Sequence, residues 1–227
     1  MATYATIQIR VNESLYLRDP ESSELGRRIV SSGILLLEQV GYEQFTFKKL
    51  AKEIHSTEAS IYRYFLNKHK FLGYIVSWYH SWIEYQIDYQ THNIDDASEK
   101  LRIAINVVSE NIEYDPQFSH IDEVVLHNVV IRESPKTLFT MEVEQDNASG
   151  YLNSLQSLCG KFAELISAVN PNYASPRTLS GIILSVALNH KFYAQHLPWL
   201  SELKVMDKGN SEVSRFIQGM IFKLIGK

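Results

Sequence analysis

Apolar residues separated by three or four positions recur through most of the chain, in runs bounded by residues that start and end helices. Ile29, Gly33 and Leu36 belong to the first run, and Gly41 follows it where a left-handed residue would end a helix. Only six prolines and ten glycines occur among 227 residues, whereas a long all-β chain would need more turn residues. The pattern therefore predicts an all-α protein.

The same signals predict nine helices after an irregular N-terminal arm that covers residues 1–20. Within the arm, the alternation of apolar and polar residues from Ile7 to Val11 is typical of a short strand. The helices are expected at about 21–40, 46–54, 58–65, 67–90, 97–113, 119–133, 144–169, 176–196 and 211–225.

Charge is distributed unevenly along the chain. The formal net charge is −4, yet the segment from Phe45 to Leu72 holds six lysines and arginines against two glutamates. That segment therefore carries +4 and the remainder −8. A basic module on an acidic body fits a DNA-binding protein with a separate regulatory domain. Two solvated lysine-rich helix faces would give the same count, and charge alone does not separate these readings.

Two short helices joined by the turn His55-Ser56-Thr57 have the dimensions of a helix-turn-helix. Leu50, Ala51, Ile54, Ile61 and Phe65 are the apolar residues expected to hold the two helices together. The outer face of the second helix keeps side chains that form hydrogen bonds, and its N-terminus offers free N–H groups. An ordinary helical hairpin explains the periodicity equally well.

The segments GYEQFTFKKLA at 41–51 and SIYRYFLNKHKFL at 60–72 strongly resemble the DNA-binding domain of the TetR family. The resemblance implies an all-α, TetR-like fold with a three-helix DNA-binding domain at 21–67. A larger helical domain for ligand binding and dimerisation would occupy 68–227. It further implies a transcription regulator without enzymatic activity or cofactor. Such a protein would be a ligand-responsive repressor that binds a palindromic double-stranded DNA operator as a homodimer.

The resemblance also implies roles for individual residues. The positions expected to bind DNA are Thr46, Thr57, Glu58, Ser60, Tyr62, Arg63, Tyr64 and Lys68. Thr46, Tyr62, Tyr64 and Lys68 match positions that contact phosphates, and the others lie where the recognition helix faces the major groove. Two features depart from the family pattern. His55-Ser56 replaces the usual Gly and small apolar residue, and Glu58 is acidic where a basic residue is expected.

Two clusters are candidates for an effector site. Trp78, Trp82 and Tyr85 form an aromatic stripe that suits either a helical core or the wall of an apolar pocket. His120, Glu123 and His127 would share one face of the helix at 119–133. That face could be solvated, bind an anionic effector or hold a metal ion. It therefore supports an alternative function as a helical metal-dependent binder or enzyme. The single cysteine, Cys159, excludes an internal disulfide.

The last two predicted helices are apolar over much of their circumference, which predicts a two-fold homodimer joined through residues 177–196 and 211–225. A large monomer that buries both faces internally is the alternative. The sequence has no basic-then-apolar leader and no apolar run of about 18 residues, so we expect a cytoplasmic protein that does not associate with membranes.

Overall fold

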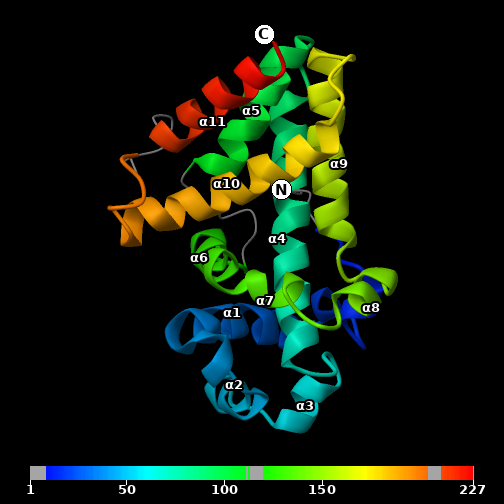
Figure 1. Ribbon diagram of the computed structural model, residues 1–227. Helices are drawn as coiled ribbons and strands as arrows, with labels where there is room; N and C mark the ends of the chain where they lie inside the picture. The colour runs from blue at the N-terminus through cyan, green and yellow to red at the C-terminus, as the bar shows by residue number, and fades with distance from the viewer. Residues whose placement is uncertain (1–8, 111, 113–119, 204–210, 227) are drawn as a thin grey trace, which may run out of the picture. The chain divides into compact units, whose positions relative to one another are not determined.

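The structure is a computed structural model that describes residues 9–110, 112, 120–203 and 211–226 (Figure 1). Regular structure in these ranges is helical and includes no strand, which confirms the all-α prediction. Of the strand expected near the N-terminus, Ile7 and Gln8 lie outside the described residues, and 9–12 have no regular structure. No helix in the described ranges has both the length and the apolar character needed to cross a membrane.

Two short 3-10 helices precede the α-helices: η1 Glu13–Leu15 and η2 Pro20–Ser22. The α-helices are α1 Glu24–Gln44, α2 Phe47–Glu53, α3 Glu58–Tyr62, α4 Lys68–Thr91, α5 Ala97–Ser109, α6 Glu123–Glu133, α7 Pro135–Leu138, α8 Val143–Ala148, α9 Asn153–Val169, α10 Pro176–His196 and α11 Glu212–Leu224.

The first three helices begin where side-chain caps predict. The hydroxyl oxygens of Ser23, Thr46 and Thr57 each accept a hydrogen bond from the backbone N–H three residues further on. Each cap satisfies an N–H group that has no partner within its helix. Gly41, with φ 72°, interrupts α1 at the position where the sequence predicts its end.

Several predicted helices differ in extent from the observed ones. The helix expected at 97–113 ends as α5 at Ser109. The expected helix at 119–133 begins only at Glu123, because the Asp122 carboxylate accepts hydrogen bonds from two N–H groups of the first turn. The expected helix at 144–169 is two helices, α8 and α9, separated by Gly150 with φ 81°. The helix expected to reach residue 65 ends as α3 at Tyr62.

The chain divides into two compact units, and the division falls within α4. Unit 1 comprises residues 1–81 and 113–154, and includes α1 to α3, the first part of α4, and α6 to α8. Its core contains the rings of Phe45, Phe47, Phe65 and Phe71. Phe45 and Phe71 are stacked with ring centroids 5.3 Å apart, and Phe65 meets Phe71 edge-on at 5.0 Å. This aromatic cluster holds the helix-turn-helix against α4.

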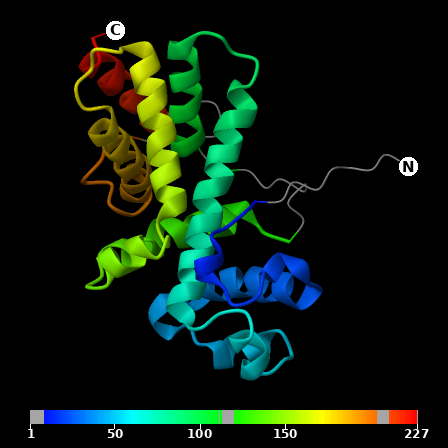
Figure 2. The same ribbon diagram turned by 90° about the vertical axis from the view of Figure 1, so that its right-hand side faces the viewer.

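Unit 2 comprises residues 82–112 and 155–227, where α5, α10 and α11 pack on one another. The second part of α4 lies beside α9 (Figure 2), and Lys161 of α9 forms an ion pair of 2.8 Å with Asp88 of α4. These units describe packing. The functional division expected at residues 67 and 68 stays a prediction.

Candidate nucleic-acid interface

Helices α2 and α3 lie side by side at one end of unit 1, joined by the turn from Ile54 to Thr57 (Figure 1). Leu50, Ala51 and Ile54 are buried toward Ile61 of α3, as the sequence predicts. His55 has φ 51°, and it is the only residue other than glycine with a positive φ in the described part of the chain. The family pattern carries glycine in this turn, and the positive φ of His55 explains why, since glycine adopts this left-handed backbone conformation most easily.

The outer face of α3 carries a row of three polar side chains at three-residue spacing. Thr57 Oγ1 accepts the Ser60 N–H at 3.2 Å, and the two hydroxyls lie 3.0 Å apart. Arg63 Nη2 donates to Ser60 Oγ at 3.3 Å. Thr57 and Arg63 are exposed and Ser60 is half-buried. The row therefore presents hydroxyl and guanidinium groups in a partly fixed arrangement to whatever contacts α3.

Glu58 and Tyr62 are the other predicted DNA-binding residues of α3. Glu58 is exposed in the first turn of the helix, where a carboxylate interacts favourably with the helix dipole. The Tyr62 side chain is 48% exposed, and its ring meets Phe47 edge-on with centroids 5.1 Å apart. Because the Tyr62 ring is fixed against Phe47 and about half of the residue is exposed, Tyr62 suits a contact with a phosphate.

Helix α2 presents a basic outer face. Thr46, Lys48, Lys49 and Lys52 are all exposed, whereas Leu50 and Ala51 point inward. Lys49 Nζ donates to the Gln44 carbonyl at 2.9 Å, and the Thr46 hydroxyl caps the helix. The charge surplus predicted for Phe45–Leu72 therefore includes three lysines on one solvent-facing helix.

The position of Tyr64 differs from the phosphate-contacting role that the family resemblance implies. The structure places it in the core, with 2% of the residue exposed, instead of on the surface where it would meet a phosphate. Its hydroxyl lies 2.8 Å from Ser23 Oγ, and its carbonyl accepts the Leu17 N–H at 2.7 Å. The Arg18 guanidinium lies 5.4 Å from the centre of its ring. Tyr64 thus ties the N-terminal arm to the end of α3.

Lys68, at the start of α4, has partners within the protein. Its Nζ donates to the Tyr42 carbonyl at 3.1 Å and lies 4.4 Å from the centre of the Tyr42 ring. These contacts connect α4 to the end of α1. A phosphate contact by Lys68 stays a prediction, and it would compete with these bonds.

Sequence reasoning missed a clamp between the end of α6 and the end of α1, formed by Arg132, Glu133, Lys136 and Tyr42. The Glu133 carboxylate accepts from Lys136 Nζ at 2.6 Å, from Arg132 Nε at 2.9 Å and from the Tyr42 N–H at 3.2 Å. Arg132 also donates to the Leu37 carbonyl at 2.8 Å. No local signal reveals this clamp, because its two halves lie about ninety positions apart in the sequence.

The His/Glu cluster expected on one helix face does not form. His120 precedes α6, and its Nε2 is 2.9 Å from the Glu21 carboxylate. His127 is buried, with Nδ1 hydrogen-bonded to the Tyr79 hydroxyl at 2.7 Å, and Glu123 is buried at the start of α6. Within the described residues, no three acidic, histidine or cysteine side chains are grouped to hold a metal ion. The metal-site interpretation is therefore wrong.

The aromatic stripe of α4 is divided between the two units. Trp78 is buried in unit 1, and Trp82 is buried in unit 2. Tyr85 is half-buried and stacks on Tyr89 with centroids 6.1 Å apart. A role for these rings in an effector site stays a prediction.

Comparison with known proteins identifies the N-terminal helices. Residues 29–75, from within α1 into α4, match the family described as bacterial regulatory proteins, tetR family. No curated protein matches the sequence significantly.

Several solved structures share the fold over most of the chain. The fatty acid degradation regulator FadR from Bacillus halodurans is 15% identical, with a TM-score of 0.60, and the match covers 96% of this chain and 97% of FadR. AibR, solved with isovaleryl coenzyme A and operator DNA, is 16% identical with a TM-score of 0.57, over 88% and 98% of the two chains. The TetR-family regulator PfmR from Thermus thermophilus is 13% identical with a TM-score of 0.55, over 88% and 97%.

Proposed function

We propose that the chain is a TetR-family DNA-binding transcription regulator, and that it is a ligand-responsive repressor that binds a palindromic operator as a homodimer. The observation that carries the proposal is the exposed row Thr57, Ser60 and Arg63 on α3, beside the basic face of α2. A short helix with an exposed polar face and a capped, N–H-rich start fits the major groove.

The polar side chains on α3 and next to it each suit a particular group of the DNA. Arg63 can donate two hydrogen bonds to a guanine, and Glu58 can accept one from a cytosine amino group. Tyr62 and the α2 lysines are suited to phosphates, which fix the register of the protein on the duplex but not the sequence that it reads.

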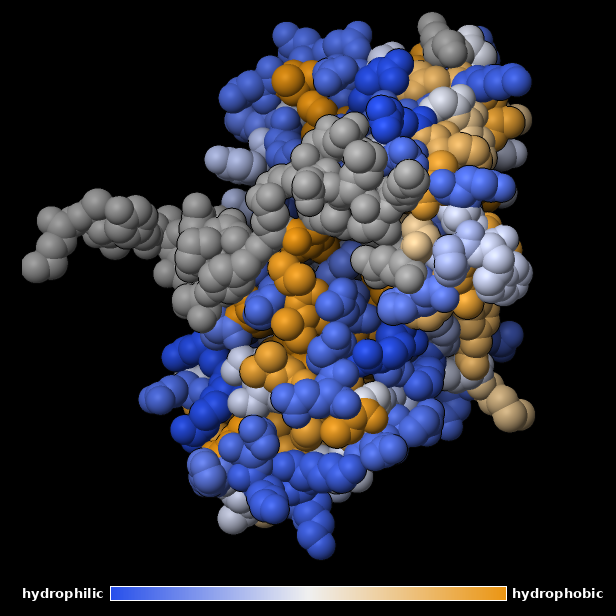
Figure 3. Space-filling model, turned by 90° about the vertical axis from the view of Figure 1, so that its left-hand side faces the viewer, coloured by the Kyte–Doolittle hydropathy of each residue, from blue (hydrophilic) through white to orange (hydrophobic). Residues whose placement is uncertain are grey.

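A homodimer follows from the small number of base pairs that one α3 can read. Two copies about 34 Å apart would read successive turns of a near-palindrome. In unit 2, α10 and α11 leave apolar side chains exposed: Ile182 is 42%, Phe216 49% and Leu224 54% exposed. Figure 3 shows apolar side chains at the surface along its right-hand edge. These residues support a contact with a second copy.

Regulation by a ligand is supported by the fold that the chain shares with AibR, which was solved with isovaleryl coenzyme A and operator DNA. A ligand can shift DNA binding only if its affinities for the DNA-binding and non-binding states differ. The clamp from Glu133 to Tyr42 and Gly41 supplies a contact through which α6 can influence the helix that precedes the helix-turn-helix.

The test is selection of operators from random duplexes by the full chain, followed by binding measurements on the enriched site. Arg63→Ala should weaken specific binding by about 1–3 kcal/mol and relax the preference at one base pair, if the contact is bidentate. Lys52→Ala should weaken all duplexes alike and lower the salt slope by about one. Lys100→Ala removes a positive charge from α5 in unit 2, away from the helix-turn-helix and from the proposed dimer contact, and is the matched control. A selection that enriches no sequence would contradict the proposal.

A further inference from the structure

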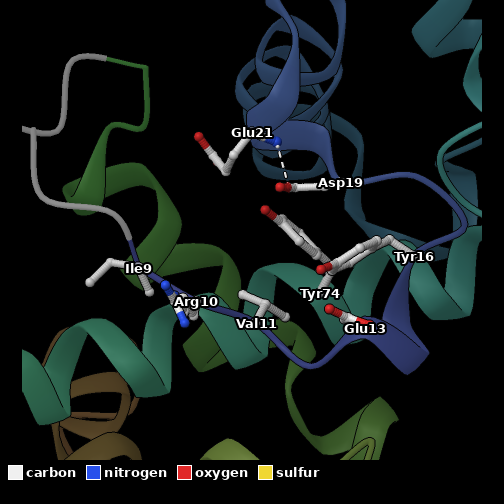
Figure 4. Close-up of a pocket in the computed structure, with 8 residues that line it drawn as sticks. All are labelled: Ile9, Arg10, Val11, Glu13, Tyr16, Asp19, Glu21 and Tyr74. Carbon is white, nitrogen blue, oxygen red and sulfur yellow. Dashed lines mark hydrogen bonds between the residues drawn. The ribbon is translucent and has the colours of Figure 1, made fainter.

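A pocket of about 280 Å³ lies in unit 1 between the N-terminal arm and α4 (Figure 4). Seven of its eight lining residues come from the arm and η2, and the eighth, Tyr74, comes from α4. The lining residues are Ile9, Arg10, Val11, Glu13, Tyr16, Asp19, Glu21 and Tyr74. A pocket of this size suits a small molecule rather than a macromolecule.

The charges of the lining favour a cation. Glu13, Asp19 and Glu21 supply three carboxylates, against the single guanidinium of Arg10. Within the described residues Arg10 makes no ion pair with any of them. Glu21 pairs with His120, and one Asp19 oxygen accepts the Glu21 N–H at 2.9 Å. The Glu13 carboxylate and the second Asp19 oxygen therefore remain to accept hydrogen bonds from a ligand.

Two tyrosine rings complete the pocket. Tyr16 and Tyr74 meet edge-on with centroids 6.0 Å apart, and Tyr74 is only 1% exposed although it lines the pocket. In Figure 4 the Tyr74 hydroxyl points toward Asp19. Aromatic faces attract cations and pack well against methylene groups.

Burial and, to a smaller extent, nearby negative charge raise the pKa of both tyrosine hydroxyls. Burial raises the pKa of Tyr16, and the charges of Asp19 and Glu13 raise it further. Burial likewise raises the pKa of Tyr74, with added effects of the Glu21 and Asp19 charges and of a hydrogen bond to Glu21. Burial is the larger cause of both shifts, and the smaller cause, the charge of the nearby carboxylates, is the one that favours a bound cation.

A metal ion does not fit this arrangement. Divalent cations need several oxygen ligands that converge on one point, and no such group of three side chains occurs in the described residues. An anion would face three carboxylates. The remaining chemistry is that of an organic cation with a short apolar body.

We propose that this pocket binds a small alkylammonium compound, such as a diamine. Its ammonium group would donate hydrogen bonds to Asp19 and Glu13, and its methylene chain would lie against Tyr16. This site goes beyond the proposed operator binding and differs from an effector site in residues 68–227, since seven of its eight lining residues precede the DNA-binding helices.

A ligand held here would also stabilise the arm where it meets the recognition helix. Leu17, between Tyr16 and Arg18, donates its N–H to the Tyr64 carbonyl directly after α3. The folded chain should therefore gain stability by RT ln(1 + [L]/Kd) at a free ligand concentration [L].

Isothermal titration of the full chain with 1,4-diaminobutane at pH 7.5 and low salt tests the proposal. We expect saturable binding of one molecule per chain. The uncharged analogue 1,4-butanediol and the dianion succinate have the same four-carbon length, and each should bind at least tenfold more weakly. Absence of saturable diamine binding, or equal binding of butanediol, overturns the proposal. Magnesium chloride that displaces the diamine at equal ionic strength would identify a metal site instead and also overturn it.

Two variants locate the binding. Asp19→Asn keeps an oxygen that can cap η2 and removes only the charge, and Glu13→Gln is its partner. Each should weaken the diamine about fivefold, the effect of one partly solvated charge pair. Asp95→Asn, in an exposed segment before α5, should leave binding unchanged. Unchanged affinity in the Asp19→Asn, Glu13→Gln double variant overturns the assignment. Operator selection uses the same protein without diamine, so either proposal can fail alone.

Discussion

His55 holds an unfavourable backbone conformation in the turn between α2 and α3. Its φ of 51° is left-handed, which costs a non-glycine residue about 1–2 kcal/mol. Glycine avoids that cost but loses more chain entropy on folding, which offsets about 0.5–1 kcal/mol. His55→Gly should therefore raise the free energy of unfolding by up to about 1 kcal/mol.

Urea denaturation measures this difference, and His55→Ala is the control, since alanine keeps the strained position without the imidazole. If His55→Gly is no more stable than His55→Ala, the positive φ at this position does not lower the stability of the chain, and the prediction is wrong.

Tyr62 and Tyr64 lie two residues apart and should respond in opposite ways to loss of the hydroxyl. Tyr64→Phe removes the hydrogen bond to Ser23 and should lower the free energy of unfolding by about 1 kcal/mol, with little effect on operator affinity. Tyr62→Phe should weaken operator binding and leave stability unchanged, because its hydroxyl has no partner among the described residues. Thermal denaturation and operator titration of both variants check the pair. Reversed responses would exchange the two roles.

The different places of these tyrosines could have been predicted from spacing. Ile61, Tyr64 and Phe65 fall at i, i+3 and i+4, so a helical period puts Tyr64 with the core residues, and Tyr62 on another face. The family pattern alone groups both tyrosines as phosphate contacts. Periodicity was the better guide for Tyr64.

At the scale of elements, the side chains that cap the start of a helix could be predicted from the sequence, whereas the points where a helix is interrupted were harder to predict. Thr46 and Thr57 begin α2 and α3 because each satisfies an N–H of the same short segment. Gly150 divides α8 from α9, yet a glycine within an apolar helical pattern is often tolerated, so its φ could not be predicted. Asp122 is a strong cap that delays α6 and thereby leaves His120 free to meet Glu21.

The clamp between α6 and α1 gives a prediction that depends on pH. Glu133 is 1% exposed; burial alone would raise its pKa, but hydrogen bonds from Lys136, Arg132 and the Tyr42 N–H lower it below the ordinary 4.5. A carboxyl whose folded-state pKa is lowered stabilises the protein above its unfolded pKa. That contribution is lost as pH falls below about 4.5 and through the folded value.

Glu133→Gln should lower the free energy of unfolding at pH 7 by about 1–3 kcal/mol, since a charged acceptor of three hydrogen bonds is replaced by a neutral one. The partners Arg132 and Lys136 are partly exposed, which keeps the cost below that of a fully buried pair. The variant and the wild type should converge in stability as pH falls below 4.5. Glu144→Gln, exposed on α8, is the control. A constant difference between pH 7 and pH 3.5 would contradict the role of the charge.

At the scale of the whole molecule, the sequence predicted which helices have two apolar faces but not which residues lie on each. Leu179 and Ile183 of α10, and Ile217 and Ile221 of α11, are buried within unit 2. Their assignment depends on how α10 and α11 pack on α5, which no local pattern records. The apolar residues that α10 and α11 leave exposed form the surface that a second copy could cover.

That remaining surface gives the last prediction. Ile182 and Phe216 are exposed, so aspartate at both positions should leave the fold of the chain intact while placing charges on the proposed contact between copies. By sedimentation equilibrium at micromolar concentration, the wild type should have twice the chain mass of 26.1 kDa, and Ile182→Asp with Phe216→Asp should have the mass of one chain. Phe139→Asp changes an even more exposed ring in unit 1 and should remain a dimer.

The monomeric variant should keep weak binding to a half-site but lose its preference for the palindrome, because two recognition helices are then no longer held one turn of DNA apart. A wild-type chain that sediments as a monomer would contradict the dimer. A double variant that still dimerises would show that the contact lies elsewhere on the chain.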